Sequence, residues 1–274
     1  MQNMLKQPLT NIDYLQTVLA KAGVAPKRSL GQNFLISPEV VEATVDTVAT
    51  GPATVTELGA GLGTLTQALI AKGITVRAIE KDDVLVDILR THAPEADIIH
   101  DDLKNVAWPW DQPYQLIGNI PYNLTGLIIR RLTQLNPIPT QAIFLVQQEV
   151  AERLLAQPPH MSLISLAVQL WGRGERLLTV PKNCFWPEPQ VSSTLILLIP
   201  GTPPTPEREA ILQLAKVCFQ GKRKQIAGSL KRSGLYTPKA IESALKSAAI
   251  DPQTRPQELS AEEWRQLYTN LAVV

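Results

Sequence analysis

Residues 55–66 have the sequence Val-Thr-Glu-Leu-Gly-Ala-Gly-Leu-Gly-Thr-Leu-Thr, and this stretch decides the fold. The apolar and β-branched residues up to Leu58 predict a buried strand, the glycines predict a turn, and the residues after them predict the start of a helix. Gly59, Gly61 and Gly63 allow the backbone to adopt positive φ and to approach a ligand closely. A strand, a glycine-rich turn and a helix in this order predict a parallel α/β sheet with its ligand at the turn.

The glycine spacing, G-x-G-x-G, differs from the dinucleotide fingerprint G-x-G-x-x-G because the third glycine comes one residue early. This spacing favours a nucleoside-type ligand over a pyrophosphate and disfavours a nicotinamide oxidoreductase. Glu57, directly before the turn, is the type of acid that holds a cationic or amino-bearing ligand.

Polar side chains also follow the next three strand-like runs. Glu80 ends the first of them, about twenty residues after the turn, where an acid accepts hydrogen bonds from both ribose hydroxyls. Asp101 and Asp102 follow the second run, where a carboxylate accepts from an adenine amine, and Asn119 follows the third. Because the ligand crevice of an open parallel sheet lies outside the carboxyl ends of its strands, we expect these side chains to converge.

Asn119-Ile120-Pro121-Tyr122 combines an amide acceptor, a rigid proline turn and an aromatic face. An exocyclic adenine amine is a poor nucleophile because its lone pair is delocalised into the ring, and a carbonyl acceptor offsets this by holding the amine near tetrahedral geometry. Taken alone, the tetrad is equally a turn whose Asn caps a helix starting near Leu124. The upstream strand ends favour the amine-modifying interpretation.

The chain divides at a proline-rich stretch, 200–206. Before it, apolar runs alternate with helical stretches from 38 to 150, the pattern of βαβ units, and beyond it the pattern is helical. We therefore predict a catalytic domain over 1–200, with an N-terminal arm over about 1–37, and a small all-α domain over 201–274. Further strands are expected at 140–146, 176–180 and 194–199, and helices at 65–71, 84–89, 124–132, 148–155, 161–171, 208–219, 225–232, 238–248 and 261–271.

Composition narrows the class of protein. Apolar residues make up 45% and charged residues 19% of the chain, as in soluble globular proteins. No apolar run is long enough to span a membrane, and the first twenty residues lack a signal-peptide pattern, so we expect a cytosolic protein without membrane contact. Cys184 and Cys218 form neither a metal-binding spacing nor a disulfide framework, and no metal is expected.

Basic residues concentrate in the C-terminal region, 201–274, and in a second patch at Lys21, Lys27 and Arg28. Residues 201–274 hold eleven Lys or Arg against seven Asp or Glu, although the whole chain carries a net charge of only +1. Such clusters suit contacts to nucleic-acid phosphates, and the alternative is an ordinary solvated helix face. The residues predicted to contact RNA are Lys27, Arg28, Lys222, Arg223 and Lys224.

In their order and spacing the motifs resemble the ribosomal RNA adenine N6,N6-dimethyltransferase family, and specifically its small-subunit branch, which acts on 16S rRNA. The resemblance extends from about Lys27 to Ser260. The matching pieces are 31–35, 55–66, Glu80, Asp101, the tetrad at 119–122, 148–153, the Phe-x-Pro-x-Pro-x-Val-x-Ser segment at 185–193, 219–224 and 255–259.

The resemblance implies a Rossmann-like sheet that binds S-adenosylmethionine, followed by a small C-terminal all-α domain. It also implies dimethylation of N6 on two adjacent adenosines near the 3′ end of 16S rRNA, in an immature 30S subunit. The enzyme would act as a monomer and without a metal.

Matching positions imply a role for each site residue. Asn33, Leu35 and the backbone around Gly59 and Gly61 would line the cofactor site. The other roles carried over are Glu80 on the ribose, Asp101 on the cofactor adenine, Asn119 between cofactor and substrate, Pro121 in the rigid turn, and Tyr122 with Phe185 stacking the extruded base.

The chain departs from the family pattern in three places: a rebuilt loop around 157–164, Ala60 in the glycine turn, and His100 before the aspartates. Because of His100, Asp102 is a second candidate for the adenine contact.

Two alternatives to the 16S rRNA function remain open. One is the branch that dimethylates 23S rRNA and confers antibiotic resistance. The other is a non-catalytic nucleic-acid-binding factor on the same scaffold.

Overall fold

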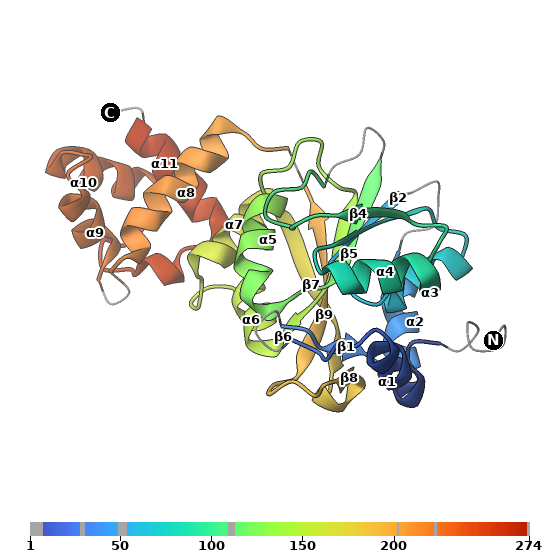
Figure 1. Cartoon of the computed structure of the whole chain (residues 1–274). Coiled ribbons are helices and arrows are strands. Elements are labelled where there is room, and N and C mark those ends of the chain that lie inside the picture. Colours follow the sequence, from blue (N-terminus) through green and yellow to red (C-terminus); the bar gives the residue numbers. More distant parts are fainter. Residues whose placement is uncertain are drawn as a thin grey trace. The chain divides into compact units, whose positions relative to one another are not determined.

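The computed structural model describes residues 8–27, 31–48, 54–108, 113–201, 203–221 and 224–272. The chain forms two compact units (Figure 1). The sheet unit comprises Met1–Ala151 and Glu175–Pro200, and the helical unit comprises Glu152–Gly174 and Gly201–Val274.

A seven-stranded sheet forms the centre of the sheet unit, with the strand order β4-β3-β2-β5-β6-β9-β7. The pairs β2/β3, β3/β4, β2/β5 and β5/β6 are parallel, whereas β6 and β9 are antiparallel. The α/β Rossmann-like fold predicted from the sequence is therefore confirmed. The strands are β2 (Thr54–Leu58), β3 (Val76–Glu80), β4 (Asp97–His100), β5 (Tyr114–Asn119), β6 (Gln141–Gln147), β7 (Gly172–Val180) and β9 (Ser193–Pro200).

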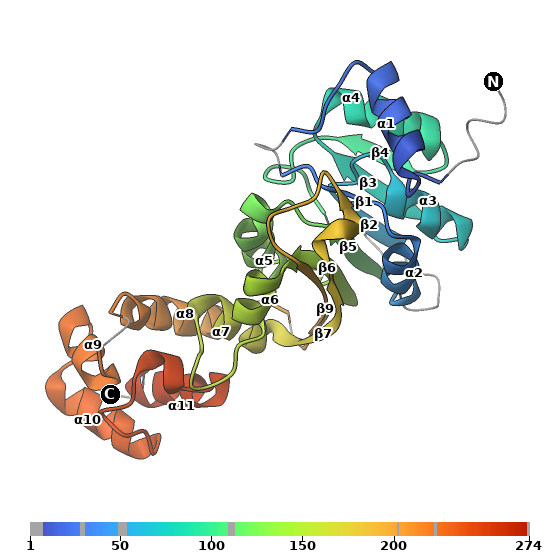
Figure 2. The same cartoon turned by 90° about the horizontal axis from the view of Figure 1, so that it is seen from below.

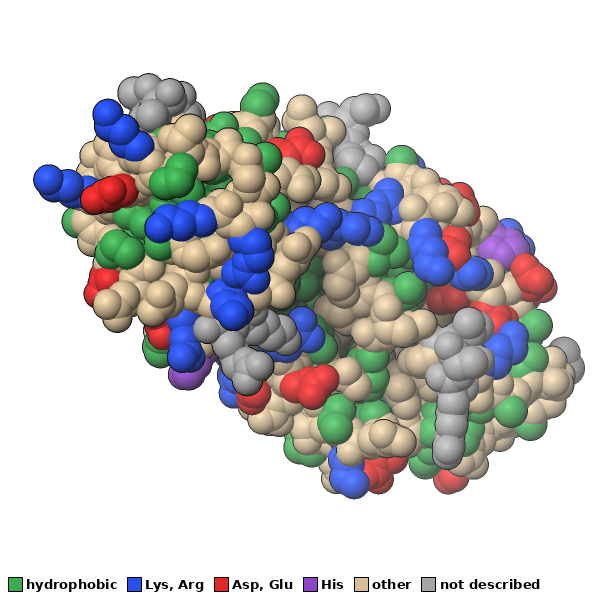
Figure 3. Space-filling model, turned by 90° about the vertical axis from the view of Figure 1, so that its left-hand side faces the viewer, with side chains coloured by type: hydrophobic (Ala, Val, Ile, Leu, Met, Phe, Trp, Pro, Cys, Tyr) green, Lys and Arg blue, Asp and Glu red, His purple; other side chains and the backbone are tan. Residues whose placement is uncertain are grey.

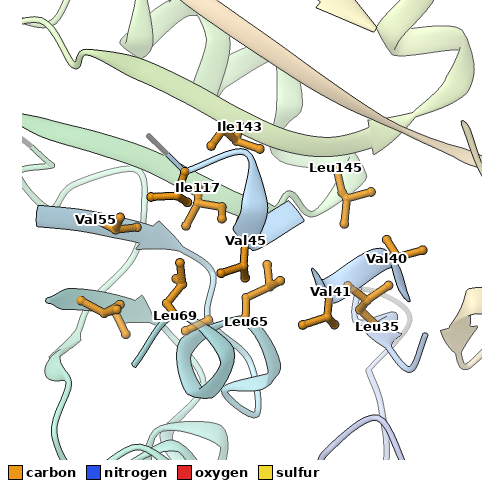
Figure 4. Packing of buried hydrophobic residues seen from close by; sticks show 14 of the residues in the cluster. Leu35, Val40, Val41, Val45, Val55, Leu65, Leu69, Ile117, Ile143 and Leu145 are labelled. Carbon is orange, nitrogen blue, oxygen red and sulfur yellow. The ribbon is translucent and has the colours of Figure 1, made fainter. Parts of the chain in front are cut away.

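Helices cover both faces of the sheet. Helices α2 (Pro38–Asp46) and α3 (Thr64–Ala71) lie on one side and α5 (Thr125–Leu132) on the other (Figure 2). α4 (Asp83–His92) follows β3, and α6 (Gln148–Leu154) follows β6. The core under α2 and α3 is made by branched aliphatic residues of both layers, including Val41, Val45, Leu65, Leu69, Val55, Ile117 and Ile143 (Figure 4). Burying these side chains is the main force that holds the helices on the sheet.

Strand order reverses between β2 and β5, which are parallel neighbours although two strands intervene in sequence. Loops that leave the carboxyl ends of these two strands must diverge to opposite faces, so a crevice opens between them. The glycine turn leaves β2 and the tetrad leaves β5. The fold thus brings the two main sequence motifs together at this switch point.

The predicted N-terminal arm contains a helix that the sequence reasoning missed, α1 (Ile12–Lys21). Its N-cap is Asn11, whose side chain accepts a hydrogen bond from the Tyr14 amide at 3.0 Å. The apolar face of α1 packs on Phe34 and Leu62. The sequence did contain a signal for this helix, an Asn followed by apolar residues at helical spacing.

The proline-rich segment before β9 also differs from expectation. It was predicted only to separate two strands, yet β8 (Phe185–Trp186) lies within it, after a 3-10 turn at Lys182–Cys184. β8 pairs antiparallel with β1 (Phe34–Leu35), with Leu35 opposite Phe185. Two motifs about 150 residues apart in the sequence are therefore joined backbone to backbone.

The helical unit consists of α7 (Leu163–Trp171), α8 (Pro206–Phe219), α9 (Ile226–Ser233), α10 (Pro238–Ser247) and α11 (Ala261–Ala272), with a 3-10 turn at Pro256–Glu258. Its core gathers Leu166 and Leu170 of α7 around Trp264, which stacks on Phe219 with ring centroids 5.9 Å apart. A single boundary at residue 200, as expected from the sequence, would put 152–174 in the sheet unit. These residues instead pack with the later helices. The sequence could not assign α7 because an apolar helix fits either core.

A glycine substitution tests the turn geometry. Gly63 has φ +97°, and an added Cβ would lie 2.7 Å from Leu89 Cδ1. We predict that Gly63→Ala lowers the free energy of unfolding by at least about 1 kcal/mol more than Gly73→Ala, because overpacking costs about 1–3 kcal/mol. Gly73 is the matched control, since it also has positive φ but no atom within 4 Å of an added Cβ. Urea unfolding of both variants measures the difference, and equal losses would contradict the prediction.

Candidate active site

A cavity of about 170 Å³ lies at the carboxyl ends of the central strands. Its lining includes the glycine turn, the ends of β3 and β5, and the segment before β1. Seven of the predicted site residues line it, namely Asn33, Leu35, Gly59, Gly61, Glu80, Asn119 and Pro121. The convergence expected from the strand ends is therefore observed for these residues.

Glu80 closes the glycine turn. Its carboxylate accepts hydrogen bonds from the backbone amide of Gly61 at 2.8 Å, and from those of Lys81 at 2.8 Å and Asp82 at 2.9 Å. Burial raises the pKa of Glu80, while these three hydrogen bonds oppose the rise. The carboxylate is thus fixed at the edge of the cavity, where it can also accept from a ligand hydroxyl.

Glu57 lines the cavity and is only 2% exposed. The hydroxyl of Thr66 on α3 donates to its Oε2 at 2.5 Å. Burial raises the pKa of Glu57 to about 8, the bond from Thr66 opposes the rise, and the nearby Glu80 charge adds to it. Two carboxyl groups in one poorly solvated cavity favour a ligand that carries positive charge. Thr66 was not singled out from the sequence.

The two aspartates after β4 are placed differently. Asp102 lines the cavity, and its carboxylate pairs with Lys81 Nζ at 2.7 Å. Asp101 is exposed, and its Oδ1 accepts from the Asp102 amide at 2.6 Å. The structure therefore brings Asp102, and not Asp101, into the lining of the cavity. The contact of Asp101 with the cofactor adenine stays a prediction.

Asn119 is tied to the N-terminal segment. Its Nδ2 donates to the backbone carbonyl of Asn33 at 2.8 Å, and this bond orients the amide. Because an amide uses its nitrogen only as a donor, the carbonyl oxygen Oδ1 remains the acceptor of this side chain. Close packing fixes the strand beneath it, since a Cβ at Gly118 would lie 2.6 Å from the backbone oxygen of Leu58. Only glycine lets β5 pass the end of β2 at this distance.

Tyr122 begins a 3-10 turn, Tyr122–Leu124, that leads into α5. Its hydroxyl lies 3.0 Å from Oγ of Ser193, a fully buried residue at the start of β9. Burial raises the pKa of Tyr122, and the bond to Ser193 opposes the rise. Ser193 is the last residue of the Phe-x-Pro-x-Pro-x-Val-x-Ser segment, so a side-chain contact joins this segment to the tetrad.

Phe185 is placed less favourably for its predicted role. Its side chain is 2% exposed and belongs to the hydrophobic cluster of the sheet unit. Neither Phe185 nor Tyr122 is among the residues that line the cavity. The ring of Phe185 would have to become accessible before it could stack on a base, and its role stays a prediction.

The basic residues predicted for RNA differ in setting. Lys27 pairs with Asp82 at 2.6 Å, at the edge of the cavity, so its ammonium group already has an acidic partner. Lys224 is exposed and lines a second cavity, in the helical unit, together with Gln225, Gly228, Gln253 and Arg255. Arg28, Lys222 and Arg223 lie outside the described residues.

No group of three or more His, Cys, Asp or Glu side chains in the described parts of the chain is arranged to hold a metal ion. None of the described helices is long and apolar enough to cross a membrane.

Residues 24–272 match the family model of the ribosomal RNA adenine dimethylases. The chain belongs to this family. It is thus an rRNA adenine dimethyltransferase, as the motifs predicted, and the match includes the glycine turn, the tetrad and the helical unit.

Named relatives agree with this assignment. The chain is 32% identical over 254 residues to "Ribosomal RNA small subunit methyltransferase A" of Dehalococcoides mccartyi (strain CBDB1), covering 88% of this chain and 87% of that protein. It is 36% identical over 239 residues to the "Probable ribosomal RNA small subunit methyltransferase A" of Thermococcus kodakarensis, covering 84% of each.

Two solved structures have the same fold. The 23S rRNA methyltransferase ErmE superposes with a TM-score of 0.71 at 25% identity, covering 88% of this chain and 100% of that one. A dimethyladenosine transferase from Plasmodium falciparum superposes with a TM-score of 0.74 at 21% identity, covering 85% and 95%, and supports the fold alone.

The buried acid makes stability depend on pH. Because the pKa of Glu57 is about 8 in the folded protein and lies at its ordinary value of 4.5 in the unfolded chain, folding favours the protonated form. Its contribution to the free energy of unfolding is complete below the ordinary value and is lost as the pH rises through about 8. We predict that Glu57→Gln reduces this loss.

Urea unfolding of the cofactor-free protein between about pH 5 and about pH 9 measures the effect. Part of the pH dependence should remain in the variant, because the pKa of Glu80 is also raised. A variant whose stability falls with pH as steeply as that of the unaltered protein would show that Glu57 is not the group responsible.

Proposed function

We propose that this protein transfers methyl groups from S-adenosylmethionine to N6 of two adjacent adenosines near the 3′ end of 16S rRNA. The observation that carries the proposal is the oriented amide of Asn119, held by Asn33 at the edge of a carboxylate-lined cavity. A carbonyl acceptor in this position can bind an amine that faces the contents of the cavity.

The residues of the cavity fit S-adenosylmethionine. Its walls combine carboxylates (Glu57, Glu80 and Asp102) with apolar side chains (Leu62, Leu85 and Leu103). We assign Glu80 to the ribose hydroxyls, Asp101 or Asp102 to the adenine amine, and Glu57 to the positively charged amino-acid end. When bound, this cofactor supplies an electrophilic methyl group on a cationic sulfur.

The chain contributes orientation and not covalent chemistry. Asn119 Oδ1 and a backbone carbonyl of the tetrad accept hydrogen bonds from the target amine and direct its lone pair. Pro121 limits the conformations of the turn that holds these acceptors. The amine becomes positively charged as its new bond to carbon forms, so it loses a proton easily and no strong general base is needed.

Base binding would use the aromatic residues. Stacking of an extruded adenine on Tyr122 contributes roughly 1–3 kcal/mol, which helps to offset the cost of unstacking. The bond from Tyr122 to the buried Ser193 fixes the tilt of this ring. Phe185 would join the stack only after its ring becomes accessible.

The choice of 16S rRNA is supported by the relatives, which are named as small-subunit enzymes and match over most of their length. ErmE, named as a 23S rRNA methyltransferase, shares the fold and supports the alternative substrate. We propose that a monomer acts on an immature 30S subunit, which places the activity in the compartment where ribosomes are assembled.

RNA phosphates would meet the basic surface of the helical unit. Lys and Arg side chains gather on the face of the molecule in Figure 3. Exposed cations of this unit include Lys216, Lys224, Lys231, Arg232, Lys239 and Lys246. Such contacts add affinity and salt dependence without reading sequence.

An assay of the two candidate substrates tests the function. We expect methyl transfer from labelled S-adenosylmethionine into immature 30S particles, with two methyl groups on each of two adjacent adenosines, and none into 23S rRNA. Mass spectrometry of the digested RNA identifies the modified positions. Incorporation into 23S rRNA alone would reject the 16S assignment.

The Asn119→Ala variant tests the role of Asn119 in catalysis. It should lower the rate of transfer by orders of magnitude while the affinity for S-adenosylhomocysteine, measured by calorimetry, changes little. Undiminished turnover by the Asn119→Ala variant would remove Asn119 from the mechanism. An unaltered protein that transfers no methyl groups would favour the non-catalytic alternative.

The role of the basic surface can be tested separately. We predict that Lys224→Glu weakens binding to 30S particles and lowers the slope of log affinity against log salt by about 1. Lys246→Glu is the matched control, because it changes the same charge on an exposed residue of the same unit that does not line the second cavity. Equal losses in both variants would indicate only a general effect of charge.

A further inference from the structure

The loop that follows β4 forms one wall of the cavity. Asp102, Leu103 and Lys104 all line it, and Leu103 is only 5% exposed. The amides of Asn105 and Val106 both donate to the Asp102 carbonyl, which folds the loop into a tight turn. The described part of the loop ends at Trp108, whose side chain is fully buried.

Arg131 of α5 holds this loop through three contacts. Its Nη1 donates to the carbonyl of Leu103, and its Nη2 donates to the carbonyl of Val106 at 2.8 Å. Its guanidinium carbon lies 4.3 Å from the centroid of the Trp108 ring. A planar fork that bonds two carbonyls and stacks on an aromatic ring at the same time requires arginine and cannot be reproduced by lysine.

The position of Arg131 links the two halves of the site. Helix α5 begins at Thr125, three residues after the tetrad ends at Tyr122. A displacement of α5 would move the tetrad and the loop together, because Arg131 bonds the loop from the same helix.

We propose that Arg131 is a positioning residue that holds the Asp102–Lys104 wall of the cavity in the shape that binds the cofactor. The inference rests on the proposed function, since it takes this cavity to be the S-adenosylmethionine site. Without Arg131 the carbonyls of Leu103 and Val106 lose their donors, and the loop must open to hydrate them. The cofactor would then have to order the loop on binding, and its affinity would fall.

Arg131→Met tests the proposal, because methionine keeps an apolar stem of similar length but donates no hydrogen bond. We expect the dissociation constant for S-adenosylhomocysteine and the KM for S-adenosylmethionine to rise about tenfold, the effect of about one lost hydrogen bond to a charged group. kcat at saturating cofactor should fall by less than about threefold.

Arg130→Met is the matched control. Arg130 is the exposed neighbour on the same helix, and the substitution removes the same charge. It should leave the dissociation constant, KM and kcat unchanged. Arg131→Lys keeps the charge but not the fork, and should give an intermediate loss of affinity.

Calorimetry with S-adenosylhomocysteine decides between positioning and a merely structural role. A folded Arg131→Met protein with a lower unfolding temperature but unchanged affinity would overturn the proposal. If that variant does not fold, Arg131→Lys decides: weaker binding supports the proposal, and unchanged binding overturns it. An unaltered protein that binds S-adenosylhomocysteine but methylates no ribosomal RNA would overturn the proposed function alone.

Discussion

The parallel pairing of β2 with β5 is the constraint on which the site depends. It sets Leu58 and Gly118 so close that a side chain at 118 would collide with the backbone. The chain must then leave the two strands in different directions, toward α3 on one side and α5 on the other. The glycine turn lies on one of these exits and Asn119 on the other, and both line the cavity.

Hydrogen bonds then convert this crevice into a site of fixed shape. Glu80 accepts from three backbone amides around the turn, so its carboxylate cannot swing away. The bond from Asn119 to Asn33 connects the tetrad to the segment that precedes β1. Arg131 bonds the opposite wall. The bonds that join Glu80 to Gly61, Asn119 to Asn33 and Arg131 to Val106 connect elements far apart in sequence. Those from Lys81 and Asp82 to Glu80 are local, so tertiary contacts and one local turn together hold the cavity.

The buried acids explain why such a site suits a cationic ligand. Glu57 is almost without solvent, and the hydroxyl of Thr66 donates the hydrogen bond that stabilises its ionised form. A positively charged ligand supplies the missing counter-charge, whereas a neutral product supplies less of it. The same burial that destabilises the cofactor-free protein at high pH therefore favours binding of the charged form of the cofactor.

The sequence by itself determined the strands of the seven-stranded sheet, the glycine turn, and the positions of Glu80 and the tetrad at strand ends. These depend on local patterns: apolar runs, glycine where the backbone needs positive φ, and polar residues directly after strands. It also determined the family, since the order and spacing of the motifs are specific.

Only the tertiary structure decided the partners of those residues. Spacing along a chain does not show that β1 pairs with β8, that Ser193 meets Tyr122, or that α7 joins the helical unit. It also could not show that Asp102 lines the cavity while Asp101 is exposed, or that the Phe185 ring is buried. The physical reason is that burial and side-chain hydrogen bonds depend on which surfaces meet, and long-range packing alone sets that.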